Sequence, residues 1–263
     1  MPFYPILKAP RTKGFTTLYN FPPNNWEVKN KTPQIVSLTY LKNNIWHTAE
    51  LDQLNFGEIC TIGYDDIASI VPDNVFPLLS LSKSILPGIS KVLPNLDCPI
   101  TVFPTWRATL GISSQYSKTS YQGEIYPFPQ HASLLTFPPL LQFEKDIENY
   151  VLLLNIEQRA SHRMTMVEIY DSNSKKLLTT KSVTNNQINI ISLDNLGFNE
   201  VSLPAIICRD MAFVPIYFSI SENGDFLSLE HTHPPASIVV HGQRSSVQKY
   251  LKKYWFSQLK KYE

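Results

Sequence analysis

Proline occurs along the whole length of this chain, and it constrains the fold more than any other feature of the sequence. The 263 residues include 20 prolines but only nine glycines. A proline inside a helix removes a hydrogen-bond donor and clashes with the preceding turn, whereas loops and sheet edges tolerate it. Long helices are therefore disfavoured over most of the chain, and short strands joined by loops are expected.

Short segments rich in β-branched and aromatic residues recur along the sequence, as is typical of strands. The clearest is 150–156, whose unbroken apolar run predicts a strand buried on both faces. Polar turns are expected at 171–174 and 185–186, and Asn223-Gly224 is typical of a hairpin turn. Strands about ten residues apart, with such turns between them, predict an antiparallel sandwich. Further strands are expected at 35–41, 100–103, 120–126, 133–137, 164–170, 177–183, 188–193, 206–208, 213–220, 226–229 and 237–240.

The predicted fold class is mostly β: an antiparallel β-sandwich of one or two domains with a basic amphipathic C-terminal helix. A proline pair at 138–139 and the charged stretch 144–148 mark the expected seam. We place an N-terminal β-rich domain at 1–145 and a C-terminal β-sandwich at 146–263, with a single two-layer domain as the alternative. Residues 78–85, between two prolines, could form a short helix.

The terminal helix is expected at 243–262, where the chain has no proline or glycine. Apolar and aromatic residues fall there at helical spacing, and the lysines lie largely elsewhere on the helical wheel. A stripe of this kind usually packs on a sheet and leaves the lysines in solvent. The alternative is peripheral contact of the helix with an anionic membrane or an acidic partner. The stripe consists of Val247, Tyr250, Leu251, Tyr254, Trp255 and Leu259.

Charge and cysteine content restrict the class of protein. The 23 basic and 22 acidic residues nearly balance, so no overall field would concentrate nucleic acid, and no nucleic-acid partner is expected. No apolar run approaches the roughly 20 residues of a transmembrane helix. Cys60, Cys98 and Cys208 are far apart and are typical of core thiols. Because no basic and then apolar leader is present, a cytoplasmic protein is expected.

A histidine pair near the C-terminus is the feature closest to chemistry. Residues two apart on an extended backbone share a face, so His231 and His233 could direct two imidazoles at one point. His241 could add a third ligand and Glu230 a carboxylate, although Glu230 points to the opposite face of a regular strand. We expect no cofactor; a divalent metal ion held by His231, His233 and His241 is the alternative. A polar contact patch and a structural role are the other interpretations.

The spacing of these histidines, with Gly242 next to the last, resembles the first motif of the cupin family. That family carries a glutamate a few residues after the pair. Here 234–238 contains no acid, and no second histidine motif precedes the terminal helix. The resemblance covers only this short stretch, so it assigns no family.

Two other groups of side chains could bind a ligand. Trp106 and Arg107 lie opposite 121–124 on an expected hairpin interrupted at 113–120, and such side chains can grip a sugar ring or a planar acid. Trp106 in the core and an Arg107–Glu124 cross-strand pair are the favoured alternative. The turn 158–163 carries two arginines that could hold phosphate, although a solvated loop is favoured.

The function that we expect is a non-catalytic binding module for a protein or carbohydrate-like ligand, recognised through a polar loop patch. No nucleophile elbow is found, so an enzyme is not favoured. The alternative is a metal-dependent hydrolase or oxygenase that uses the three histidines. The ligand-binding residues that we predict are His231, His233, Glu230, Arg244, Trp106 and Arg107.

Overall fold

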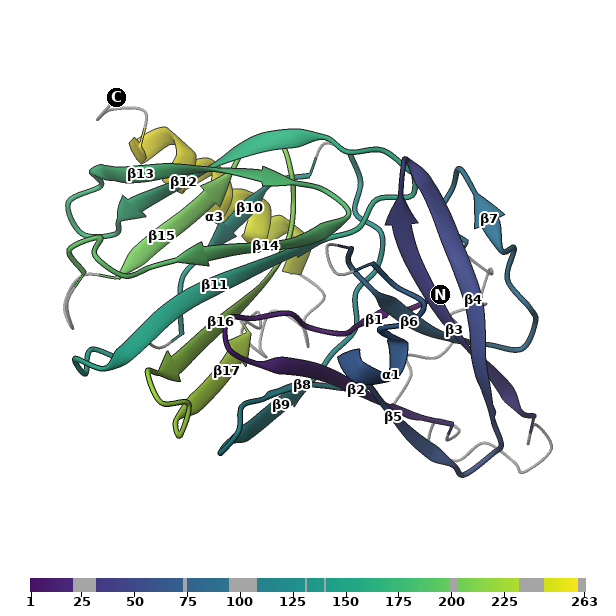
Figure 1. Ribbon diagram of the computed structural model, residues 1–263. Helices are drawn as coiled ribbons and strands as arrows, with labels where there is room; N and C mark the ends of the chain where they lie inside the picture. The colour runs from purple at the N-terminus through teal and green to yellow at the C-terminus, as the bar shows by residue number, and fades with distance from the viewer. Residues whose placement is uncertain are drawn as a thin grey trace.

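A computed structural model describes residues 1–20, 32–72, 75–94, 108–130, 132–139, 141–198, 203–231 and 244–259; in the last segment, side chains are described from residue 249. Over these residues the strands form four antiparallel sheets, and the C-terminal helix α3 is Arg244–Leu259 (Figure 1). The mostly β fold with a C-terminal helix is therefore confirmed.

Two sheets form the N-terminal half. One has the order β1-β6-β3-β4-β7, with bounds Tyr4–Pro5, Leu78–Ser82, Gln34–Lys42, Ile45–Leu54 and Ile89–Ser90. The other has the order β5-β2-β8-β9, with bounds Ile59–Gly63, Lys13–Tyr19, Thr109–Ser113 and Lys118–Gln122. A short helix, α1, follows β5 at Tyr64–Ile67. The helix considered at 78–85 is wrong, because β6 pairs with β1 on one side and β3 on the other.

Two further sheets form the C-terminal half and pack face to face. One has the order β14-β11-β16-β17, with bounds Gln187–Ser192, Ile147–Asn155, Val214–Ser221 and Leu227–His231. The other has the order β10-β15-β12-β13, with bounds Leu134–Thr136, Pro204–Cys208, Met164–Asp171 and Leu177–Thr184.

Strand β11 lies in the middle of the molecule and is buried on both faces, as predicted. Its side chains alternate between two cores, since neighbouring residues of a strand point to opposite sides. Val151 and Leu153 join the core of the C-terminal sandwich. Leu152 and Leu154 join a larger core with residues of the N-terminal sheets. The domain division at 145/146 stays a prediction.

The outer face of the β10-β15-β12-β13 sheet is partly covered by α3, drawn in yellow in Figure 1. Leu259 packs there against Tyr170, Ala205 and Ile207. Within the described residues, neither helix has the length and apolar character needed to cross a bilayer.

The predicted turns lie where the sequence places them. Asn186 connects β13 to β14 with a positive φ of 55°, and Gly224 closes the β16–β17 hairpin with a φ of 77°. Both residue types adopt this left-handed conformation more readily than others. The strands expected at 100–103 and 237–240 lie outside the described residues.

Candidate binding groove

Among the predicted ligand-binding residues that the structure describes, His231 contacts an aromatic side chain. It is the last residue of β17, and its ring lies 4.4 Å from that of Tyr121 on β9, measured between centroids. Glu230 is exposed, while Leu229 before it is buried, as the alternation of a strand requires. The structure thus joins His231 to an aromatic side chain that the sequence assigned to a different patch.

The structure does not test the predicted roles of the remaining residues. His233, His241, Trp106 and Arg107 lie outside the described residues, as does the side chain of Arg244 at the start of α3. In the part of the chain that is described, no group of three or more His, Cys, Asp or Glu side chains is arranged to hold a metal ion. The three-histidine site stays a prediction.

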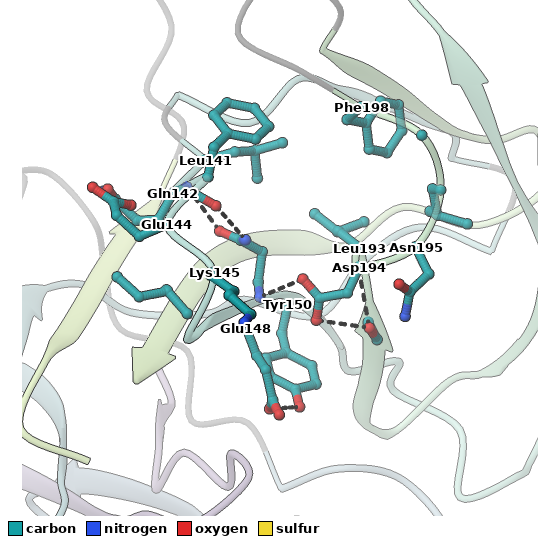
Figure 2. Close-up of a pocket in the computed structure, with 16 residues that line it drawn as sticks. Leu141, Gln142, Glu144, Lys145, Glu148, Tyr150, Leu193, Asp194, Asn195 and Phe198 are labelled. Atoms are coloured by element: carbon teal, nitrogen blue, oxygen red, sulfur yellow. Dashed lines mark hydrogen bonds between the residues drawn. The ribbon is translucent and has the colours of Figure 1, made fainter. Parts of the chain in front are cut away.

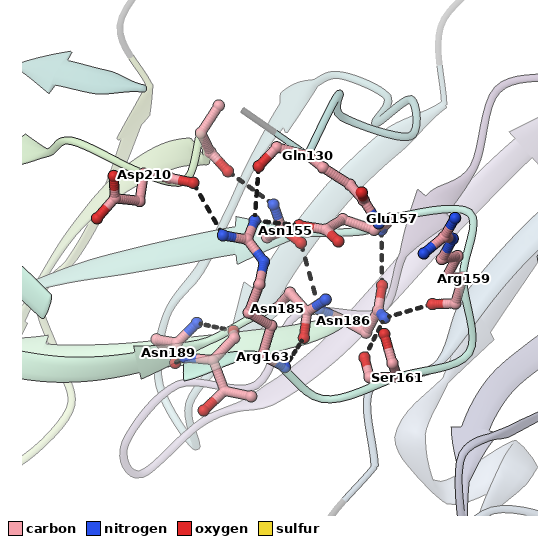
Figure 3. A network of polar contacts seen from close by, with 12 residues as sticks. Gln130, Asn155, Glu157, Arg159, Ser161, Arg163, Asn185, Asn186, Asn189 and Asp210 are labelled. Carbon is pink, nitrogen blue, oxygen red and sulfur yellow. Dashed lines mark hydrogen bonds and ion pairs between the residues drawn. The ribbon is translucent and has the colours of Figure 1, made fainter. Parts of the chain in front are cut away.

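The arginine-containing turn at 158–163 is held by internal hydrogen bonds (Figure 3). The Arg163 guanidinium donates to Glu157 Oε1 at 2.7 Å and to the carbonyl oxygens of Gln130 and Asp210 at 3.0 Å. The Glu157 side chain is only 3% exposed. Because Arg163 donates to three protein acceptors, its role here is structural rather than ligand binding.

Asparagines complete this network. Asn186 donates to the carbonyl oxygens of Arg159 and Ser161 and accepts a hydrogen bond from the Glu157 amide. The Asn185 side chain accepts from the Arg163 amide. These bonds fix the end of β11 to the β13–β14 turn.

The opposite end of the sandwich carries a groove of about 680 Å³ (Figure 2). One wall is the segment that leads into β11, and the other is the loop that follows β14. These walls are 141–150 and 192–198, and every residue of the first is a lining residue except Asp146.

The first wall is fixed by Asn149, a buried residue of β11. Its side chain accepts a hydrogen bond from the backbone amide of Gln142 at 2.9 Å and donates to the backbone carbonyl of Gln142 at 2.7 Å. Ser219 of the neighbouring strand donates to the same Asn149 oxygen. The Asn149 side chain therefore holds the segment before β11 by one accepted and one donated backbone hydrogen bond, as a neighbouring strand would.

The second wall is a tight turn that follows β14. Asn195 and Gly197 both have positive φ values, 59° and 79°. The Asp194 carboxylate accepts hydrogen bonds from the backbone amide of Asn149 at 3.0 Å and from the Ser192 hydroxyl at 3.2 Å. The two walls thus share one network, which preorganises the groove.

Two lining residues of the groove, Glu148 and Tyr150, have shifted pKa values because they are hydrogen-bonded to each other and Glu148 pairs with Arg11. The Tyr150 hydroxyl donates to Glu148 at 2.5 Å, and Arg11 donates to both Glu148 oxygens at 2.9 and 3.2 Å. The hydrogen bond from Tyr150, followed by those from Arg11, lowers the pKa of Glu148 below its ordinary 4.5. Burial, with the neighbouring carboxylate, raises the pKa of Tyr150 to about 12.

The rim of the groove combines aromatic and polar side chains. Phe143 is 43% exposed, and Phe198 lies on the wall opposite Gln142 and Glu144 (Figure 2). Asn195 is exposed beside Asp194. Sequence reasoning missed this site because 144–148 was interpreted as a domain seam. The turn signal Asp194-Asn195-Leu196-Gly197 could have indicated one wall.

Comparison with models of protein families, with curated proteins and with solved structures finds no match for this chain.

Proposed function

We propose that the protein is a non-catalytic binding module that takes a small, carbohydrate-like ligand in the groove between 141–150 and 192–198. The observation that carries this proposal is the pairing of aromatic rings with preorganised hydrogen-bonding groups on two facing walls.

The size of the groove favours a small ligand over a protein partner. Its volume of about 680 Å³ lies within the roughly 300–1,000 Å³ typical of small-molecule sites. Protein partners usually require larger and flatter surfaces.

The chemistry of the lining favours a polyhydroxylated ligand. Carboxylates at Glu144 and Asp194 can accept from ligand hydroxyls, and the amide of Asn195 can both donate and accept. Phe143 and Phe198 offer apolar ring surfaces against which the face of a sugar ring can pack. Because Asn149 and Asp194 already hold the walls, little ordering is required when the ligand binds.

The proposal is tested by titrating the isotope-labelled protein with neutral and acidic oligosaccharides at millimolar concentration. Amide chemical shifts should change first in 141–150 and 192–198. Phe198→Ala and Asn195→Gly should each weaken binding about tenfold, the loss of one packing or hydrogen-bonding contact, and glycine keeps the positive φ of residue 195.

A matched control is Tyr116→Ala, because Tyr116 is an exposed aromatic residue on the β8–β9 turn and does not line the groove. It should bind as the wild type does. Shift changes confined to residues outside both walls, or no change with any sugar, would rule out the groove as a carbohydrate site.

A reducing, cytoplasmic location is part of the same proposal. Cys60 and Cys208 are free thiols in the structure, and Cys208 is buried in the sandwich core. Burial raises the pKa of both thiols, which disfavours the reactive thiolate. Alkylation and intact-mass measurement of protein from cells should find all three cysteines reduced.

A further inference from the structure

Helix α3 has two apolar faces, of which the sheet covers one. Trp255, Phe256 and Leu259 pack towards the β10-β15-β12-β13 sheet, and the Trp255 ring meets Phe137 edge-on at 5.0 Å between centroids. The predicted apolar stripe is therefore divided, because three of its members face away from the sheet. Tyr250, Leu251 and Tyr254 are 69%, 43% and 50% exposed.

Helical spacing explains this division. Residues 252, 255, 256 and 259 lie three or four positions apart and share the face on the sheet, whereas 250, 254 and 257 share the opposite face. Lys252 belongs to the inner face, where its ammonium group donates to the carbonyl of Ser133. An aromatic face left in solvent is unusual for a surface helix, whose outer side is normally polar.

The outer face carries positive charge that no acid on the helix neutralises. Lys249 and Lys253, four residues apart on one flank of this face, are both exposed. The sequence 244–259 contains no aspartate or glutamate. Next to the helix, Lys175 lies 3.5 Å above the ring of Trp255, which packs against the sheet.

Two acids of β12, in the sheet that the helix covers, are engaged within the fold. Glu168 pairs with Arg209 at 3.1 Å. The Ser174 amide, followed by that of Asn173, donates to Asp171 and lowers the pKa of its carboxyl, and Lys175 is the cation that offsets this ionised group. The lysines of the outer face therefore retain their attraction for an external anion.

We propose that the outer face of α3, formed by Tyr250, Leu251 and Tyr254 with Lys249 and Lys253 along its flank, docks on an anionic lipid surface. Tyrosines are favoured at the level of lipid headgroups, and lysines beside them are attracted by anionic lipids.

Charge argues against a second copy of the chain as the occupant. Packing two α3 helices through this face would bring the lysine pairs of both copies together, with no acid on either helix to pair with them. An anionic surface compensates the same charges. The proposal is independent of the groove, which lies at the ends of β11 and β14 rather than on the sheet that α3 covers.

The test is co-sedimentation of the full chain with vesicles of phosphatidylcholine, with and without phosphatidylserine. Binding should require phosphatidylserine and should weaken as salt is raised, because ions screen the exposed lysines. Lys249→Gln/Lys253→Gln should bind roughly 30-fold more weakly, as expected for two lysines near an anionic surface. Tyr250→Ser/Tyr254→Ser should also bind more weakly at unchanged charge.

The matched control is Lys42→Gln/Lys181→Gln, which removes two exposed lysines from strands β3 and β13. It should bind as the wild type does. Equal binding with and without phosphatidylserine, or unchanged binding of Lys249→Gln/Lys253→Gln, would overturn the proposal. So would equally strong capture by soluble polyglutamate, which would assign the face to an acidic protein. All substituted residues are exposed, and unchanged thermal unfolding confirms that the variants fold.

Discussion

At the scale of single residues, the structure depends strongly on Arg163. Its guanidinium is the cation that neutralises Glu157, whose carboxylate is almost fully buried. Arg163→Met should therefore lower the free energy of unfolding by about 3 kcal/mol, the cost of leaving a buried charge without its partner. Urea unfolding followed by circular dichroism measures this loss.

The double variant Arg163→Met/Glu157→Gln should recover part of that loss, because no buried charge is then left unpaired. Arg159→Met is the matched control, since Arg159 is exposed on the same turn. Equal stabilities of Arg163→Met and Arg159→Met would contradict the structural role of Arg163.

Glu148 should make stability depend on pH. Hydrogen bonds from Tyr150 and Arg11 lower its pKa in the folded state below the ordinary 4.5. Its contribution is therefore present above about pH 4.5 and is lost as the pH falls through the lower folded pKa. Since Glu148 and Arg11 are each 40% exposed, the effect should be small. Glu148→Gln should reduce the loss of unfolding free energy below about pH 4.5, as measured by urea unfolding at a series of pH values. An unchanged loss would exclude the ion pair as its cause.

At the scale of elements, Gly14 allows the N-terminal segment to cross strand β2. A Cβ at this position would lie 1.7 Å from the carbonyl oxygen of Leu7, and backbone atoms cannot move as a side chain can. Gly14→Ala should cost at least about 3 kcal/mol of stability or prevent folding. Gly63→Ala is the control, because the atoms nearest to its Cβ are 3.6 Å away. It should cost no more than about 1 kcal/mol in the same thermal and urea unfolding measurements; similar losses would contradict the crossing geometry.

The sequence predicted those elements whose signal is local. The apolar run at 150–156 could be read as a doubly buried strand because every side chain in it needs a core. Asn223-Gly224 and Asn185-Asn186 indicated turns because few other residues adopt positive φ values. By contrast, β2 and β4 were not predicted, since polar residues are mixed with apolar ones along both strands.

The groove could not be predicted because its geometry depends on contacts between segments distant in sequence. Asn149 holds the first wall through hydrogen bonds with Gln142, seven residues earlier. It is joined to the second wall through Asp194, which lies 45 residues later in the sequence. Likewise, no spacing rule shows that Tyr250 and Tyr254 face solvent. The sheet packs against one side of α3, and that side includes Lys252.

At the scale of the whole molecule, the shared strand β11 should make the two halves unfold together. Leu152 and Leu154 pack with the N-terminal sheets, and Leu153 packs in the C-terminal sandwich. Trp46 of β4 also donates to the carbonyl of Gln158, at 3.3 Å. Native-state hydrogen exchange should therefore give amides in β3 and β16 the same free energy of opening, within about 1 kcal/mol.

Leu153→Ala makes this experiment decisive. It opens a cavity on the face of β11 that points away from the N-terminal half, and it should cost about 3 kcal/mol. If the chain unfolds as one unit, β3 amides lose as much protection as β16 amides, although β3 touches nothing that was changed. If 1–145 and 146–263 unfold separately, only β16 loses protection, and the domain division expected from the sequence is then confirmed instead.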